Sequence, residues 1–498
     1  MNHAARLSLA GGTSPLPLMP GTVVWFGHDL RLEDHAALSF AAEQGGPVVP
    51  LFVCAPEEYG DWAPGGAHRW WLRQSLEALD GSLREKGSRL IVRQGSSLDA
   101  IRDVLKATGA DRVAWLTRYE PTLRQRDIGI RDALAGDGIR CHQFAGRLLH
   151  NPEEIRTTTD GPYHVFTPFW KKFRKQVEVG EPLNVPRLGK SRAPDSWPDA
   201  DSLDDLGLTP QQQDGVDWAG GMREFWQPGE AGAHDRLARF LSVAHTYDED
   251  RNRPDLRHTS ELSPHLHWGE ISPRTVWTRV DTWVTNGPTR EAADSYLSEI
   301  AWREFSYHVL HAHPDTPTEP LKDKFEGFRW RTTPSDLEAW QRGRTGYPIV
   351  DAGMRQLWAL GWMHNRVRMI VASFLTKDLL VPWQEGARWF WDTLCGGDLA
   401  NNTMGWQWSA GSGADAQPFF RIFNPVGQGE RHDPEGAYVR NWIPELADLP
   451  TKWIHKPWEA PAEVLEAAGV TLGETYPEPI VDHAERRDLA MERYNEIR

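Results

Sequence analysis

The sequence predicts an α/β domain followed by a larger all-helical domain. From Thr22 onward, short apolar runs alternate with segments of helical periodicity, which is typical of a parallel sheet covered by helices. From about residue 231 the β-branched runs disappear and helical patterns dominate. The 498 residues are enough for two or three domains with sizeable buried cores.

Five strands are expected in the first domain. Their apolar runs occupy Thr22–Phe26, Pro47–Cys54, Arg89–Arg93, Arg112–Thr117 and Ile139–Phe144. Helical segments lie between them, such as the one that carries Trp70, Trp71, Leu72, Leu76 and Leu79. This alternation implies a Rossmann-like, five-stranded parallel sheet with helices on both faces. No G-x-G-x-x-G motif follows the first strand, so a dinucleotide is not supported there.

The composition divides the chain into four parts. Residues 1–21 are expected to form a loose extension and 22–150 the α/β domain. Residues 151–230, rich in Pro, Asp, Gln and Gly, are expected to be a long connector outside the core. Residues 231–498 form the helical domain, whose clearest predicted helices are Ala292–His311, Ser335–Gln341, Val350–Leu360 and Arg366–Leu380.

The overall composition excludes several classes of protein. A mean hydropathy of -0.56 without a long apolar run argues against a membrane-spanning chain, and 40% hydrophobic residues argue against complete disorder. Three scattered cysteines are too few for a disulfide framework, a zinc site or a four-thiolate iron–sulfur cluster. No signal peptide is evident. We therefore expect a reducing, cytoplasmic environment, with no metal and no membrane partner. A monomer is also expected.

The charge is unevenly distributed. The chain has 55 Lys and Arg against 70 Asp and Glu, a net charge of -15 that argues against non-specific nucleic-acid binding. Residues 321–377 nevertheless contain ten Lys or Arg and five Asp or Glu, a local charge of +5. Because aromatic residues are interleaved with these cations, the segment predicts a nucleic-acid groove in preference to a merely solvated basic face.

Tryptophan is unusually frequent, and thirteen of the 25 fall between Trp268 and Trp408. Most are expected to pack in the core. Four places instead set indoles or hydroxyls beside polar groups: Glu299–Arg303, Trp362–Met369, Asp398–Trp408 with Phe419–Pro425, and Thr259–Pro264, which follows Tyr247. The first and third favour a planar, polar-edged ligand, and the second belongs to the segment that favours a nucleic-acid groove. The hydroxyls before a proline-started helix favour phosphate. A helix cap explains the first and the fourth equally well when each is taken alone.

Together, these segments resemble the photolyase/cryptochrome family, most closely the class I-type cyclobutane pyrimidine dimer photolyases. The resemblance runs from about Val23 to Trp458. It rests on Trp25-Phe26 with Asp29–Leu32, Thr345–Arg355, Trp362-Met-His-Asn365, Gly405-Trp-Gln-Trp408 and Arg421–Pro425. It implies FAD in the helical domain, working as FADH⁻, and a light-dependent enzyme that splits pyrimidine dimers in UV-damaged DNA by electron transfer.

The resemblance also implies roles for individual residues. The predicted FAD contacts are Tyr247, Thr259, Ser260, Glu261, Leu262, Ser263, Arg368, Gly396, Gly397, Asp398 and Asn402. Trp330, Trp383 and Trp406 match the family's electron-transfer chain. Glu299 and Asn365 would hydrogen-bond the pyrimidine edges of the flipped dimer. The predicted contacts to the lesion and the flanking DNA are Arg251, Trp302, Arg303, Arg366, Met369, Trp408, Arg421 and Gln428.

Two positions depart from the family's pattern. Gly396 stands where the family usually has an Asp that pairs with the arginine at Arg368, so that arginine needs another partner. Tyr119-Glu120 is followed by Pro121, not by the Asn-Glu pair of many folate-binding members. The antenna chromophore therefore stays open among a folate, a deazaflavin, a second flavin and none.

Several other functions compete with dimer repair. A six-four photolyase would have His in place of Asn365, and the iron–sulfur branch needs four cysteines. A cryptochrome-type blue-light receptor shares the fold, FAD and tryptophan chain, but Asn402 and the short stretch after Trp458 favour repair. Without the resemblance, a Trp-rich acidic protein also fits a glycosidase, which would be colourless.

Overall fold

The computed structural model describes residues 19–189, 192–209, 216–285, 290–331, 333–416 and 418–497. Residues 1–18 of the predicted extension, and 190–191 and 210–215 of the predicted connector, lie outside the described residues. Within the described ranges, none of the helices has the length and apolar character needed to cross a bilayer.

The first domain is built on a parallel sheet of five strands in the order β3-β2-β1-β4-β5. The strands are β1 (Thr22–Phe26), β2 (Val48–Cys54), β3 (Ile91–Gln94), β4 (Arg112–Leu116) and β5 (Arg140–Phe144). In register, Thr22 of β1 lies opposite Val48 of β2 on one side and Arg112 of β4 on the other. The predicted Rossmann-like sheet is confirmed, with strand ends that differ by up to two residues.

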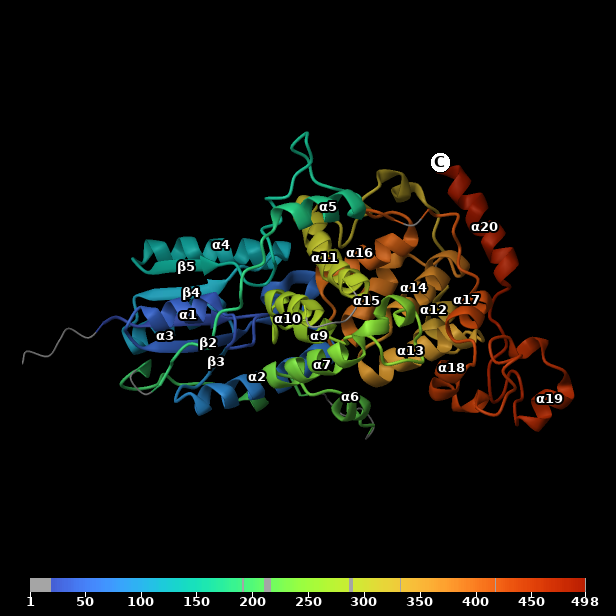
Figure 1. The fold of residues 1–498 in the computed structure, drawn as a ribbon, viewed down its shortest axis with the longest axis horizontal. Coiled ribbons are helices and arrows are strands. Elements are labelled where there is room, and N and C mark those ends of the chain that lie inside the picture. The colour runs from blue at the N-terminus through green and yellow to red at the C-terminus, as the bar shows by residue number, and fades with distance from the viewer. Residues whose placement is uncertain are drawn as a thin grey trace, which may run out of the picture.

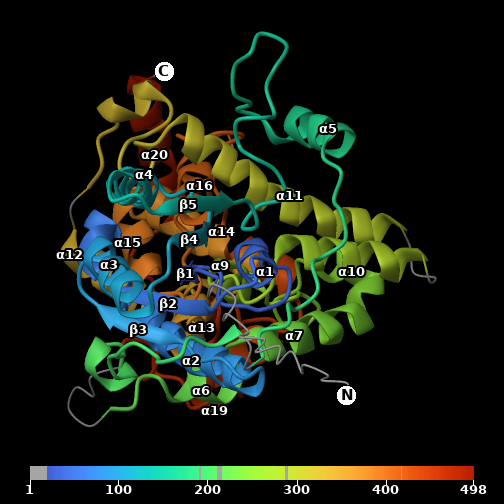
Figure 2. The ribbon, with the colours of Figure 1, turned by 90° about the vertical axis from the view of Figure 1, so that its left-hand side faces the viewer.

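Helices cover both faces of this sheet, as Figures 1 and 2 show. They are α1 (Ala36–Glu43), α2 (Gly66–Glu85), α3 (Ser97–Thr108) and α4 (Pro121–Gly136). Alternate residues of β1 face opposite ways: Val24 and Phe26 pack with α1 and α2, whereas Val23 and Trp25 pack with α3 and α4. Burial on both faces explains why the strands are continuous apolar runs.

The connector contributes to the core, contrary to the prediction from its composition. It contains α5 (Phe166–Gln176) and α6 (Gly220–Phe225). Phe166, Phe169 and Phe173 of α5 share one helix face and are buried against α11. Figure 2 shows α5 beside α11.

The second domain is helical, as predicted, and occupies the right-hand part of Figure 1. Its helices are α7 (Glu230–Val243), α8 (Tyr247–Asp250), α9 (Ser263–His267), α10 (Pro273–Thr285), α11 (Arg290–Ala312), α12 (Pro334–Gln341), α13 (Pro348–Leu360), α14 (Asn365–Ser373), α15 (Trp383–Thr393), α16 (Leu399–Ala410), α17 (Pro425–His432), α18 (Ala437–Trp442), α19 (Ala462–Ala467) and α20 (His483–Glu496). The single helix predicted for Arg366–Leu380 is instead α14 followed by a π-helical turn, Phe374–Asp378.

A buried polar network joins the two domains. The Arg147 guanidinium, just after β5, donates to both carboxylate oxygens of Glu120, at 2.9 and 3.0 Å. Arg303 of α11 donates to the carbonyl of Arg147 at 3.0 Å. All three side chains are buried, so the helical domain is fixed against the carboxyl ends of β4 and β5.

Candidate functional site

The loop predicted to hold the FAD phosphates lies between α8 and α9, and arginines fix it. Glu261 has a left-handed backbone, with φ of +55°, and a buried carboxylate. Guanidinium groups of Arg236, Arg239 and Arg257 all contact that carboxylate. Arg239 also donates to the carbonyl of Thr259, 3.3 Å away. Three positive charges thus surround one negative charge, an arrangement that holds the loop and favours a further anion.

The other predicted contacts of this loop differ in exposure. Tyr247 and Leu262 are buried in one apolar cluster. Thr259 and Ser260 are partly exposed, and Ser263 is exposed. The hydroxyl groups are therefore open to a phosphate, whereas the carboxylate of Glu261 is already occupied by the protein.

Arg368 of α14 fits an anionic cofactor. Its Nε donates to the carbonyl of Met363 at 2.8 Å, and no carboxylate of the described chain pairs with it. Burial alone lowers the pKa of Arg368 to about 10. A buried guanidinium is costly unless an anion compensates for it, and FADH⁻ is such an anion. On α16, Asn402 donates from Nδ2 to the carbonyl of Ala387 at 2.9 Å, which leaves its amide oxygen for a ligand.

The turn before α16 explains why Gly396 replaces the usual aspartate. A Cβ at Gly396 would lie 2.5 Å from the Cα of Pro264 in α9, so no side chain fits. The next amide, that of Gly397, donates to Nε2 of His68 in α2 at 2.9 Å. These close approaches pack the turn between two helices and leave Arg368 without its family partner.

Asp398 is held by the protein on both of its carboxylate oxygens. One oxygen caps α16 by accepting from the backbone and side-chain amides of Asn401, at 2.9 and 2.6 Å. The other accepts from the hydroxyl of Tyr307. Burial raises the pKa of Asp398, but the neighbouring His267, the charge of Arg303 and the hydrogen bond from Tyr307 hold that pKa below its usual range. The carboxylate of Asp398 is therefore negatively charged, and it positions α16.

Glu299 of α11, a predicted contact to the lesion, is held by an arginine. The Arg251 guanidinium donates to its carboxylate at 2.7 Å and to the hydroxyl of Ser295 at 3.0 Å. Burial raises the pKa of Glu299, although Arg251 opposes that shift.

The other predicted lesion contacts lie on α14. Asn365, at the start of α14, is exposed, and Met369 is partly exposed.

A basic rim adjoins Glu299. Arg366 donates from Nε and Nη2 to Oδ1 of Asn252, at 3.1 and 2.6 Å. Its pKa is lowered by burial and by the positive charges of Arg251 and Arg431. Mutual repulsion of this kind favours a polyanion. The sequence prediction missed Arg431, although its spacing from Gln428 places both on one face of α17.

Trp302 has one face covered by the protein. The Phe166 ring of α5 stacks on it with centroids 3.9 Å apart and an interplanar angle of 11°. Trp302 and Trp408 are both partly exposed. Beyond Phe166, α5 carries the cations Lys171, Lys172, Arg174 and Lys175 on its solvent side. The sequence prediction missed this basic helix because it lies in the predicted connector. Its run of Lys and Arg residues is the signal that could have revealed it.

Arg303 does not belong with the predicted DNA contacts. Its guanidinium is buried and donates to the Arg147 carbonyl and, at 3.5 Å, to Glu304. One step round α11 from Trp302, the side chain points into the domain junction. A phosphate at the surface is therefore out of its reach.

Part of the local charge of +5 in residues 321–377 is paired or buried within the protein. Arg329, Arg342 and Arg355 pair with Glu496, Glu338 and Glu445, respectively. Lys377 is buried. At the candidate site, Arg366 lies near Arg251 and Arg431, which are distant from it in sequence. The nucleic-acid groove along residues 321–377 stays a prediction.

The three predicted electron-transfer tryptophans share one apolar cluster. Trp383, the first residue of α15, and Trp406 of α16 are buried, and Trp330 is partly exposed at the edge of that cluster. The indole of Trp406 packs directly on Gly386, where any side chain would overlap it. One partly exposed indole and two buried ones are compatible with the electron-transfer chain, which stays a prediction.

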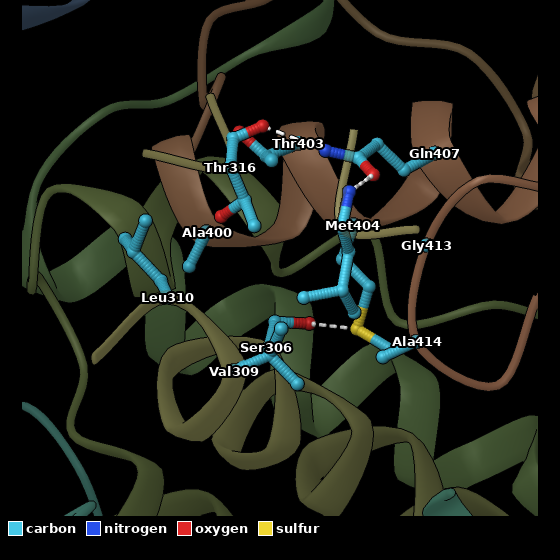
Figure 3. Close-up of a pocket in the computed structure, with 11 residues that line it drawn as sticks. Ser306, Val309, Leu310, Thr316, Ala400, Thr403, Met404, Gln407, Gly413 and Ala414 are labelled. Carbon is cyan, nitrogen blue, oxygen red and sulfur yellow. Dashed lines mark hydrogen bonds between the residues drawn. The ribbon is translucent and has the colours of Figure 1, made fainter. Parts of the chain in front are cut away.

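A small cavity lies between α11 and α16 (Figure 3). Ser306, Met404 and Gln407 are among the residues that line it, and the Ser306 hydroxyl donates to Sδ of Met404 at 3.0 Å. Its free volume of about 10 Å³ is at most that of one water molecule. We therefore treat it as a packing void.

Both domains match known protein families, and nearly the whole chain is similar to known photolyases and cryptochromes. Residues 22–187 match the family model described as DNA photolyase, and residues 296–496 match the FAD binding domain of DNA photolyase. The chain is 47% identical to a deoxyribodipyrimidine photo-lyase of Agrobacterium fabrum over 481 residues, 96% of this chain and 98% of that protein. It is 40% identical to Cryptochrome-1 of Arabidopsis thaliana, covering 94% of this chain and 69% of that protein.

Solved structures show the same architecture. A class III photolyase from Agrobacterium tumefaciens aligns with a TM-score of 0.93 and 46% identity, over 98% of this chain and 99% of that one. An archaeal photolyase from Sulfolobus tokodaii, solved with two FAD molecules, aligns with a TM-score of 0.80 and 29% identity, over 96% of this chain and 100% of that one.

Proposed function

Because the chain belongs to the DNA photolyase family, we propose that it is a light-dependent DNA repair enzyme that splits cyclobutane pyrimidine dimers. The observation that carries the proposal is the match to the FAD binding domain of DNA photolyase, in which the predicted lesion contacts Trp302, Asn365 and Trp408 are at least partly exposed. These residues lie on or at the start of α11, α14 and α16, and both α11 and α14 pack against α16. When bound in its reduced form, FAD would supply the electron-transfer chemistry for opening the cyclobutane ring. The protein's own residues bind and orient the lesion.

Recognition of the dimer depends on extrusion from the duplex. A dimer pairs and stacks badly, so flipping it out costs a few kcal/mol at most. The free faces of Trp302 and Trp408 offset this cost, at roughly 1–3 kcal/mol for each stacked base. Phe166 keeps the Trp302 ring in place while its other face receives the lesion. Arg251, Arg366, Arg421, Arg431 and Gln428 would contact the flanking phosphates and sugars.

We infer a class III photolyase in place of the class I type expected from the motifs. The support is the 46% identity and TM-score of 0.93 to a class III structure over nearly the whole chain. The proposal includes an α/β domain that ends at about residue 150 and a helical domain that begins at about residue 231. It also includes action as a monomer and an intracellular location.

Illumination of the reduced protein with DNA that contains thymine dimers tests the function. We expect light-dependent recovery of thymine absorbance and none in the dark. The cryptochrome-type receptor is the second candidate, favoured by the 40% identity to Cryptochrome-1. A protein that binds FAD but repairs no dimer under light would support that receptor and contradict the repair enzyme.

Replacement of Glu299 by glutamine tests its role toward the dimer. A protonated carboxyl donates a hydrogen bond to the dimer radical anion, and burial raises the pKa of Glu299. Because the proton is present below that pKa, wild-type repair yield should fall as pH rises through it. Glu299→Gln should lower the yield several-fold, remove this pH step and leave DNA affinity within about twofold. The control is Glu291, an exposed residue of the same helix. Glu291→Gln should leave the repair yield, its pH dependence and the DNA affinity unchanged. An unaltered yield in Glu299→Gln would refute the role of Glu299.

A further inference from the structure

Lys377 is a buried lysine just beyond the helix that carries the predicted lesion contacts. It lies in the π-helical turn Phe374–Asp378 that follows α14, and its side chain is 1% exposed. Burial lowers the pKa of Lys377 to about 7, against the charge of Asp378. A buried ammonium is expensive, so the groups that it contacts are informative. Single π-helical turns are frequent at functional sites.

The contacts of Lys377 lead to the loop between α16 and α17. Its Nζ donates to the carbonyl oxygen of Arg421 at 3.1 Å and lies 5.4 Å from the ring centroid of Phe419. Ser373, one turn earlier, accepts from the backbone N–H of Phe423 at 3.3 Å. The end of α14 and its turn therefore fix the backbone of the loop on either side of Arg421.

The same turn is anchored on its other side by the C-terminal helix. Asp378 is fully buried, and its carboxylate is hydrogen-bonded to Nδ1 of His483, the first residue of α20, at 2.5 Å. Figure 1 shows α20 at the outer edge of the helical domain. A turn held from both sides is a rigid support for the loop.

We propose that Lys377 is a positioning residue for DNA binding, which fixes the loop from which the exposed Arg421 side chain reaches a flanking phosphate. The inference rests on the proposed function for the identity of the polyanion. Its physical basis is entropic: an arginine on a fixed backbone loses less conformational freedom when it binds than one on a mobile loop. Nothing in the sequence pattern pairs Lys377 with Arg421, which lies 44 residues away.

Lys377→Met tests the proposal, with Thr376→Val as the matched control. Methionine keeps the length of the buried chain but donates no hydrogen bond. Thr376 is also buried, and its hydroxyl donates only within its own helix, to Ala372 at 2.7 Å. In the free holoprotein, hydrogen exchange at the amides of residues 419–423 should accelerate about tenfold in Lys377→Met, the effect of losing one hydrogen bond to a charged group. Affinity for dimer-containing DNA should fall by about the same factor.

A double-mutant cycle with Arg421→Ala separates positioning from a general structural role. If Lys377 acts through Arg421, Lys377→Met should weaken DNA binding less than about twofold once Arg421 is absent. Additive losses, or unchanged exchange at residues 419–423, would overturn the proposal. A wild-type protein without dimer binding would overturn the proposed function together with the DNA role, whereas wild-type repair with unchanged exchange would overturn the role of Lys377 alone.

Discussion

Replacement of Trp406 by phenylalanine is expected to slow photoreduction of bound oxidised FAD by an order of magnitude or more while sparing repair by the pre-reduced protein. Trp406 is one of the two buried tryptophans of the predicted electron-transfer chain, and phenylalanine removes the oxidisable indole but keeps an aromatic ring on Gly386. Because repair starts from reduced FAD, it does not require this path. Absorbance spectra under light with an external reductant measure the first effect, and dimer repair after chemical reduction measures the second.

The matched control for Trp406 is Trp115, which is fully buried in the α/β domain. Trp115→Phe should leave photoreduction unchanged apart from any loss of folded protein. Loss of both photoreduction and repair in Trp406→Phe, at normal FAD content, would contradict the assignment. Trp330 is the partly exposed member of the three predicted electron-transfer tryptophans, and Trp330→Phe should reproduce the photoreduction defect.

Replacement of Arg147 by methionine should lower the free energy of unfolding by about 3–5 kcal/mol. The reason is the uncompensated Glu120 carboxylate that remains in the domain junction, since Arg147 and Glu120 are only 3% and 6% exposed. Urea unfolding, with the midpoint and slope determined together, measures the loss. Burial raises the pKa of Glu120, but Arg147 and His28 hold that pKa well below its usual range. The stability from this pair is therefore present at neutral pH and lost as pH falls toward the lowered pKa.

The control for Arg147 is an ion pair of the same chemistry at the surface. Arg124 and Glu153 lie 3.2 Å apart, and both are about half exposed. Arg124→Met should cost less than about 1 kcal/mol because water solvates the remaining carboxylate. Equal losses in the two variants would show that burial does not decide the strength of the Arg147 pair.

The order and type of the secondary structure follow from the sequence because they depend on local pattern. Apolar runs such as Thr22–Phe26 are strands buried on both faces, and helical periodicity marks α11 and α13 to within two residues. The motifs around Glu299, Trp362 and Trp406 are contiguous in sequence, so the family and its FAD-binding domain are recognisable from the chain alone.

The direction in which each polar side chain points depends on the tertiary structure. Arg303 follows Trp302 directly, yet burial against Arg147 turns it into the domain junction. Glu261 and Asp398 fall within cofactor motifs, but distant arginines and Tyr307 occupy their carboxylates. The connector helix α5 reaches Trp302 only because the fold brings it to α11.

The sequence by itself therefore determined the two domains, the family and the set of candidate residues, since these are encoded by local periodicity and contiguous motifs. The tertiary structure alone decided which of those residues face a ligand and which hold the framework. The physical reason is that a buried charge must be paired. Its partner, as with Lys377 and Arg421 or Arg147 and Glu120, comes from whichever segment the fold places beside it.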